Sequence, residues 1–167
     1  MVGYGGVFSV YNYYGGVFMF NLIENIHEGS VLEINKKKYR ALAKVKYVTE
    51  SETTNWYVKI KLESHHVLVI APFDNYMYFG SVGEPYPCGL PAPDSIVYCG
   101  KIYTKDAEDY QIVKDFVFGD FLSMEGEVQY ADFSCGDSLI SLGVILRTQK
   151  RADVYAKVID LSDVIIV

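Results

Sequence analysis

Three runs decide the fold: Tyr39-Arg-Ala-Leu-Ala-Lys-Val-Lys-Tyr-Val-Thr-Glu50, Trp56-Tyr-Val-Lys-Ile-Lys-Leu-Glu63 and Val67-Leu-Val-Ile70. In the second run apolar and charged residues alternate with period two, which is typical of a β-strand with one dry and one wet face. The polar segment between the first two runs predicts a turn, so they form a long antiparallel hairpin. The third run has no polar face and fits a strand covered on both sides.

Further strands follow along the chain at hairpin spacing. Val31–Ile34, the lysine turn at 36–38 and the first run from Tyr39 form a hairpin. The segments that read as strands after the third run are Tyr76–Phe79, Ile96–Tyr103, Glu127–Phe133, Leu139–Leu146 and Val154–Ile159. A turn is predicted at Lys105–Asp109, and Tyr110–Phe118 has both helical and strand periodicity, with strand preferred. The sequence therefore predicts a mainly β protein whose antiparallel hairpins form a barrel or a sandwich, with at most one or two short helices. One such helix is expected over Asn21–Glu28.

The 167 residues fit a single β-rich domain over 21–167, preceded by a Gly/Tyr-rich arm or leader over 1–20. That arm contains Tyr4-Gly-Gly-Val-Phe8 and, ten positions later, Tyr14-Gly-Gly-Val-Phe18, and it is too polar to span a bilayer. Four of the five prolines lie in 84–94, which predicts a stiff loop between two β-rich halves.

The formal net charge is −6, and all of the excess negative charge follows Pro85. Up to Glu84 there are eight basic and eight acidic residues, and beyond it seven and thirteen. Because phosphate-backbone binding needs clustered positive charge, a nucleic-acid partner is not expected. The acidic second half could instead meet a basic protein partner, with Asp106, Glu108 and Asp109 as the candidate contacts.

Fifteen tyrosines and nine phenylalanines leave a second possibility, an aromatic-lined site for a small apolar or aromatic ligand. Trp56, Tyr76 and Tyr78 are the candidates for that lining. The adjacent His65 and His66 sit at a predicted turn and are the candidate metal ligands, although two exposed turn histidines are the favoured explanation of the pair.

No nucleophile elbow, paired catalytic carboxylates or phosphate loop occurs in the sequence, so no catalytic residue and no cofactor is predicted. Three scattered cysteines without a Cys-x-x-Cys pair fit a reducing cytoplasm, whereas export would allow a Cys88–Cys99 bridge. No transmembrane segment is predicted, and nothing indicates an oligomeric state. The favoured function is a non-enzymatic binding or accessory module that uses the acidic face. A ligand-binding barrel comes second, and an enzyme whose residues converge only in space comes third.

Residues 119–142 contain short motifs that resemble those of a known protein family. The segments Gly119-Asp120-Phe121, Gly126-Glu127-Val-Gln-Tyr130-Ala-Asp132-Phe133 and Leu139-Ile-Ser-Leu142 resemble a bacterial family catalogued as domain of unknown function 4178. The run around Trp56 is similar to that family's first hairpin, and the similarity spans about 29–160. Gly143 stands where the family usually has an acid, and the acid after the tryptophan is also missing. The resemblance implies a β-rich bacterial domain and supplies no reaction.

Overall fold

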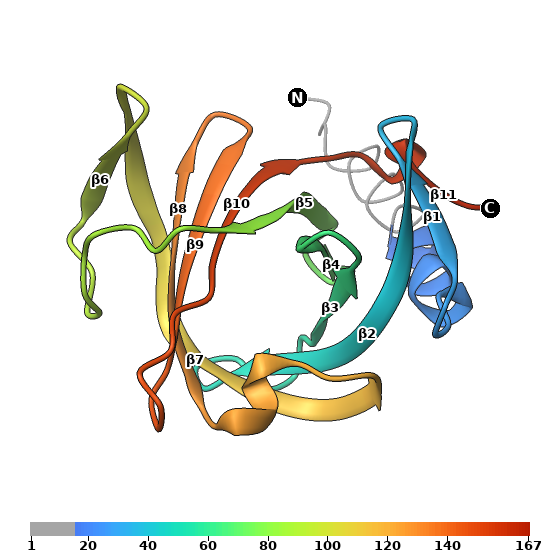
Figure 1. Ribbon diagram of the computed structural model, residues 1–167, viewed down its shortest axis with the longest axis horizontal. Helices are drawn as coiled ribbons and strands as arrows, with labels where there is room; N and C mark the ends of the chain where they lie inside the picture. Colours follow the sequence, from blue (N-terminus) through green and yellow to red (C-terminus); the bar gives the residue numbers. More distant parts are fainter. Residues whose placement is uncertain (1–15) are drawn as a thin grey trace, which may run out of the picture.

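Eight antiparallel strands close into a barrel in the computed structural model, which describes residues 16–167 (Figure 1). The order around the barrel is β2, β3, β4, β5, β10, β9, β8 and β7, and pairing of β7 with β2 closes it. The predicted β fold is confirmed, and the barrel is the form it takes. The strand bounds are β2 Lys37–Thr49, β3 Tyr57–Leu62, β4 His66–Ala71, β5 Tyr76–Gly83, β7 Lys101–Phe118, β8 Val128–Cys135, β9 Ser138–Ile145 and β10 Asp153–Val158.

Three short strands continue the sheet beyond the barrel. β1 (Val31–Ile34) pairs with β2, and β11 (Val164–Ile166) pairs with β1. β6 (Ser95–Tyr98) pairs with the first residues of β7. Two 3₁₀ helices, η1 (Leu122–Glu125) and η2 (Leu161–Asp163), lie in the connections. Most of the duplicated N-terminal unit lies outside the described residues.

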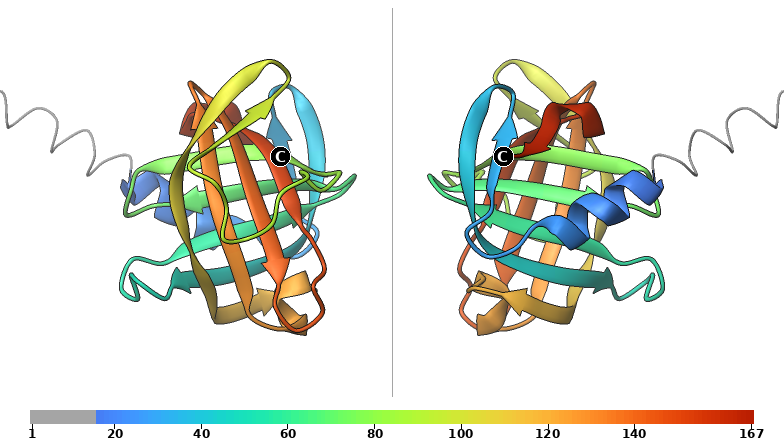
Figure 2. Two further views of the ribbon diagram at one scale, coloured as in Figure 1. Left: turned by 90° about the vertical axis from the view of Figure 1, so that its left-hand side faces the viewer. Right: turned by 90° about the vertical axis from the view of Figure 1, so that its right-hand side faces the viewer.

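The barrel has two halves, β3–β5 and β8–β10, and the strands of one half run across the direction of the strands of the other. Figure 2 shows β3, β4 and β5 passing across the direction of β8, β9 and β10. The long strands β2 and β7 bend to join the halves, and register shifts interrupt their pairing with each other and with β3 and β8. Bulges bend a strand and increase its twist, which is what closure of a small barrel requires.

In β3 the apolar side chains face out of the barrel and the charged side chains face into it. Val58, Ile60 and Leu62 point out of the barrel and are at most 1% exposed, because other elements cover the outer wall. Lys59 and Lys61 point into the lumen. The dry face of this strand is therefore the outer one.

The first outer cover is a helix over 16–25, which lies across β3, β4 and β5 (Figure 2). Met19, Ile23 and Ile26 pack against the apolar outer face of those strands. The helix therefore begins earlier than the predicted Asn21–Glu28, and those bounds were wrong. Its end is set by Lys44 on β2, whose Nζ donates 2.7 Å hydrogen bonds to the carbonyl oxygens of Ile23 and Ile26. No local pattern near the helix reveals so distant a partner.

The second outer cover is the proline-rich segment 84–94, which contains no strand, as predicted. Its Ala92 packs with Phe133, Ile140 and Leu142 on the outer wall of β8 and β9. The two covers bury apolar surface on both halves of the barrel from outside.

Strand β7 is continuous from Lys101 to Phe118, so the turn predicted at Lys105–Asp109 is wrong. The polar residues there belong to a register shift between Lys105 and Ala107, where a bulge takes up the irregularity. The preferred strand reading of Tyr110–Phe118 is confirmed. All three cysteines are free thiols. Within residues 16–167, no helix has both the length and the apolar character of a membrane span.

Candidate functional site

Two cavities occupy the barrel lumen, one toward each open end. The lysine-side cavity has a volume of about 340 Å³ and contains Lys59 in its wall. The carboxylate-side cavity has a volume of about 380 Å³ and contains Asp132 in its wall. Both are bounded by the same four side chains, which form the layer between them: Tyr78, Gln111, Tyr130 and Ser141.

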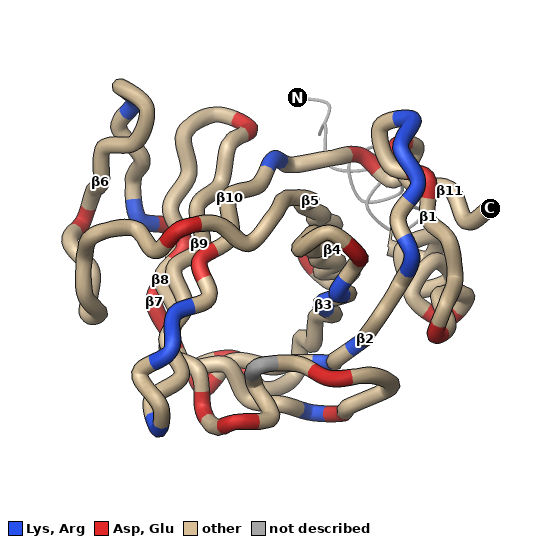
Figure 3. The backbone as a smooth tube through the Cα atoms, viewed as in Figure 1, with Lys and Arg blue, Asp and Glu red and all other residues tan. Residues whose placement is uncertain are grey.

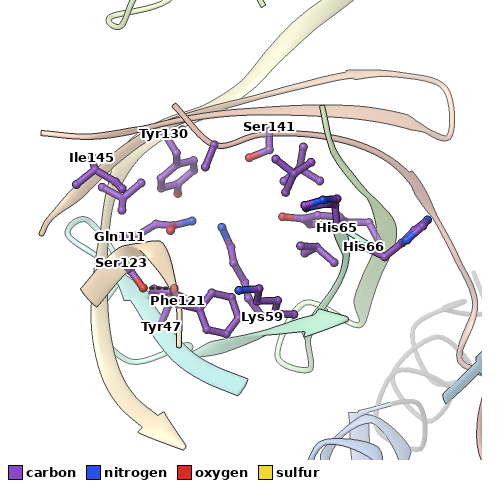
Figure 4. Close-up of a pocket in the computed structure, with 18 residues that line it drawn as sticks. Tyr47, Lys59, His65, His66, Gln111, Phe121, Ser123, Tyr130, Ser141 and Ile145 are labelled. Atoms are coloured by element: carbon purple, nitrogen blue, oxygen red, sulfur yellow. Dashed lines mark hydrogen bonds between the residues drawn. The ribbon is translucent and has the colours of Figure 1, made fainter. Parts of the chain in front are cut away.

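The wall of the lysine-side cavity is largely apolar. Its aliphatic side chains come from β4, β5, β8, β9 and β10, which are strands of both crossing halves: Val67, Val82, Val128, Ile145 and Val154. Figure 4 shows Lys59, Gln111 and Tyr130 directed into the space enclosed by these strands. Such a wall, apolar with a few inward polar groups, is typical of small-molecule sites.

Helix η1 lies against one end of this cavity. The Tyr47 and Ser123 hydroxyl oxygens are 2.6 Å apart, which ties η1 to β2 (Figure 4). Burial raises the pKa of Tyr47 to about 12, although the bond to Ser123 acts in the opposite direction. The Tyr47 hydroxyl is thus neutral at ordinary pH.

Lys59 is the only cation placed deep in the described part of the lumen. Burial lowers the pKa of its ammonium to about 8, and the charge of Asp132 opposes that shift only in part. Among residues 16–167, no carboxylate oxygen lies within 4.0 Å of its Nζ. The ammonium instead lies 5.5 Å from the centroid of the Tyr47 ring. A desolvated cation without a contact ion pair favours an incoming anion or hydrogen-bond acceptor.

The carboxylate-side cavity gathers tyrosines around a buried acid. Tyr57, Tyr76, Tyr78 and Tyr130 line it together with Asp132. Burial raises the pKa of Asp132, while Ser141 and Lys59 act in the opposite direction. Its Oδ1 is buried and has no hydrogen-bond partner among the described residues.

Strand register explains why these groups meet. Asp132 on β8 lies opposite Ser141 on β9, so both side chains project to the same face. On β3, Tyr57 and Lys59 are two residues apart and share the inner face. Closure of the barrel then brings β3 across the lumen from β8.

The aromatic candidates divide between the two sides of the wall. Tyr76 and Tyr78 line the lumen as part of the carboxylate-side cavity. Trp56 instead packs outside, edge to face with Phe20 and Phe73, and the Lys46 ammonium lies 4.0 Å from the centroid of its indole ring. Trp56 therefore belongs to the outer cover and is not a lumen residue.

The three acidic candidates do not form one surface. Glu108 lies 3.2 Å from the Lys105 ammonium and accepts a 3.1 Å hydrogen bond from the Ala92 amide. Asp109 accepts a 3.2 Å hydrogen bond from the Ser51 amide, and Asp106 is exposed. Acidic positions are spread around the barrel with basic ones between them (Figure 3).

The two candidate metal ligands point apart. His65 lies at the mouth of the lysine-side cavity, whereas the His66 ring stacks on Phe79 with 5.3 Å between centroids and packs beside Tyr39 (Figure 4). Within the described chain, no group of three or more His, Cys, Asp or Glu side chains is placed to hold a metal ion.

Sequence reasoning did not single out Lys59, Gln111, Asp132 or Ser141 as site residues. Lys59 was assigned to a solvent-facing strand surface, because a lumen-facing lysine and a solvent-facing one give the same alternation. The feature of the sequence that could have placed Lys59 in the lumen is the fully apolar strand β4, which is paired with β3. Its two buried faces require cover on both sides, so the polar face of β3 lies inside the barrel.

Comparison with known proteins adds no relative: no protein-family model matches this chain, and neither does any curated protein or solved structure. The resemblance to domain of unknown function 4178 stays a prediction.

Proposed function

We propose that this chain is a binding protein that holds one small apolar or aromatic molecule in its lysine-side cavity. The observation that carries the proposal is the cavity itself, about 340 Å³ inside a closed barrel with a mainly apolar wall. Small-molecule sites have volumes of roughly 300–1,000 Å³ and few inward polar groups. Barrels of eight strands are able to enclose one small ligand.

Lys59 specifies the polar end of the ligand. Its ammonium lies in the lumen, partial desolvation lowers its pKa to about 8, and no carboxylate of the described chain is in contact with it. A ligand carboxylate would supply the missing counter-charge and form charge-assisted hydrogen bonds. The preferred ligand is therefore an aryl or alkyl carboxylate whose apolar body contacts Val67, Val128 and Val154.

Docking of a basic protein on the acidic half has less support. Glu108 and Asp109 already accept hydrogen bonds from Ala92 and Ser51. A partner would have to displace or share those contacts, and exposed ion pairs contribute little free energy. The lumen offers buried surface and unsatisfied charge together, which is why the ligand proposal is preferred.

Calorimetric titration with 2-naphthoate and with the uncharged 2-naphthalenemethanol tests the proposal. We expect 2-naphthoate to bind one-to-one with a Kd of about 100 µM, by the affinity per atom typical of small ligands. The alcohol should bind about tenfold more weakly. Val67→Phe places a ring in the cavity from a buried wall position and should abolish binding, whereas Val97→Phe is the matched control because Val97 is exposed on β6. Equal binding by both variants, or none by the native protein, contradicts the proposal.

A further inference from the structure

The carboxylate-side cavity has its own opening, which is separate from that of the lysine-side cavity. Glu52 and Asn55 of the β2–β3 connection and Asp74 of the β4–β5 connection line its outer part, and all three are exposed. His65, at the β3–β4 turn, lines the lysine-side cavity instead. Because successive hairpin turns of an antiparallel barrel lie at alternate ends, the two cavities open at opposite ends.

The inner part of the carboxylate-side cavity is a cage of aromatic rings. Tyr57 comes from β3, Tyr76 and Tyr78 from β5, and Tyr130 from β8, so the rings come from both halves of the barrel. Tyr76 and Tyr78 are neighbours on one face, with 5.8 Å between ring centroids. Rings arranged around a space attract an organic cation through their negatively charged faces.

Asp132 places a carboxyl group within this cage. Its Oδ1 is buried and has no hydrogen-bond partner among the described residues. Lys59 is near enough to influence its pKa but does not come within 4.0 Å of a carboxylate oxygen. An unpaired buried carboxylate costs folding free energy, and a cation bound next to it would offset that cost.

Acidic residues also line the mouth of the carboxylate-side cavity. Glu52 and Asp74 line the outer part of the cavity, and no lysine or arginine of residues 16–167 does. A cleft lined by one sign of charge concentrates ligands of the opposite sign. The lysine-side cavity is lined by Lys59, Lys61 and His65 and has the reverse preference.

We propose that the carboxylate-side cavity is a second binding site, specific for a small organic cation such as a trimethylammonium or primary amine, with Asp132 as the counter-charge and the tyrosine rings as the cage. This site is independent of the proposed carboxylate site, since its cavity, mouth and charge are different. Tyr78, Gln111, Tyr130 and Ser141 lie between the two, so occupancy of one does not require occupancy of the other.

Titration with choline and with 3,3-dimethylbutan-1-ol tests this proposal, because the alcohol has the same shape without the charge. Binding is followed by calorimetry and by NMR shifts of the tyrosine rings. We expect choline to bind with a millimolar or lower Kd and the alcohol at least tenfold more weakly. Equal affinity for the two probes, or no choline binding by the native protein, overturns the proposal.

Four variants, three of them in the cavity wall, locate the binding site. Asp132→Asn should weaken choline at least tenfold while leaving 2-naphthoate binding intact, which also shows that this variant folds. Tyr76→Phe should retain choline binding because the ring remains, whereas Tyr76→Leu should weaken it threefold to tenfold. Asp137→Asn is the matched control, because Asp137 is exposed and lines neither cavity, and it should bind choline as tightly as the native protein. Unchanged choline binding by Asp132→Asn overturns the proposal even where 2-naphthoate binds as expected.

Discussion

Arg151 and Asp153, two residues apart at the start of β10, form an ion pair with 2.7 Å between Nη2 and Oδ2. The Asp153 carboxylate is 1% exposed and also accepts a 2.8 Å hydrogen bond from the Tyr86 amide. The Arg151 guanidinium donates to the carbonyl oxygens of Tyr86 and Cys88. The pair thereby fastens the proline-rich segment to the barrel wall.

Asp153→Ala is expected to lower the free energy of unfolding by about 3 kcal/mol. It leaves a partly buried guanidinium without its counter-charge and the Tyr86 and Gly143 amides without their acceptor. Urea unfolding measures this change. Asp137→Ala is the control, since Asp137 lies at an exposed turn and its side chain forms no hydrogen bond within the described chain. Equal stability of the two variants contradicts the anchoring role.

Lys44→Met tests how the N-terminal helix is held. The substitution removes two 2.7 Å charge-assisted hydrogen bonds to the carbonyl oxygens of Ile23 and Ile26. The expected loss is about 1–3 kcal/mol of unfolding free energy, with faster amide exchange in 16–25. Lys38→Met, on the exposed part of β2, provides the comparison. Native-like exchange in the Lys44 variant would show that apolar packing alone holds the helix.

Lys59→Met should stabilise the unliganded protein at pH 7.5 by about 1–2 kcal/mol, because it removes a desolvation cost that water in the lumen only partly relieves. The folded-state pKa of Lys59 is about 8, below the ordinary value of 10.5 for a lysine. Between these values the unfolded chain binds more protons, so the native protein gains stability as pH rises. The advantage of the variant should therefore shrink from pH 7.5 to 9.5.

Thermal or urea unfolding of both proteins across that range gives the difference directly. Measurement stops at pH 9.5 because Tyr47 and Tyr76 have pKa values raised to about 12, and ionisation of tyrosines in the unfolded chain destabilises the fold at higher pH. A difference that stays constant with pH would show that Lys59 titrates normally in the folded protein.

Ser123→Ala removes the 2.6 Å contact between η1 and Tyr47 at the end of the lysine-side cavity. If ligands pass this end, 2-naphthoate should dissociate several times faster with a smaller change in Kd. Stopped-flow displacement measures the rate, with Ser134→Ala as the control on β8. An unchanged dissociation rate would place the ligand's route elsewhere.

The strand positions were largely predictable because period-two patterns and turn residues are local signals. Thus Tyr57–Leu62 and His66–Ala71 lie where alternation and the apolar run predicted strands. The turn predicted at Lys105–Asp109 was wrong because a bulge in a long strand and a turn use the same polar residues. The helix bounds depended on Lys44, which is 18 residues from Ile26.

The candidate site was predictable only in part. Two of the aromatic candidates, Tyr76 and Tyr78, line the lumen, and their role in binding stays a prediction. Lys59 and Asp132 could not be identified, because alternation shows which residues share a face and not whether that face is enclosed. Their desolvation costs free energy only once the barrel is closed. Closure depends on the pairing of β2 with β7, whose partners are 62 or more residues apart in sequence.

The placement of the two outer covers has an evolutionary consequence. Two of the apolar clusters in the described chain lie outside the wall, one containing Ile26 and Ile60 and the other Ala92 and Phe133, and their burial stabilises the fold. Mutations at those positions threaten folding, whereas mutations of inward polar residues change what the interior accepts. The class of ligand that the lumen binds can therefore change during evolution while the fold is retained.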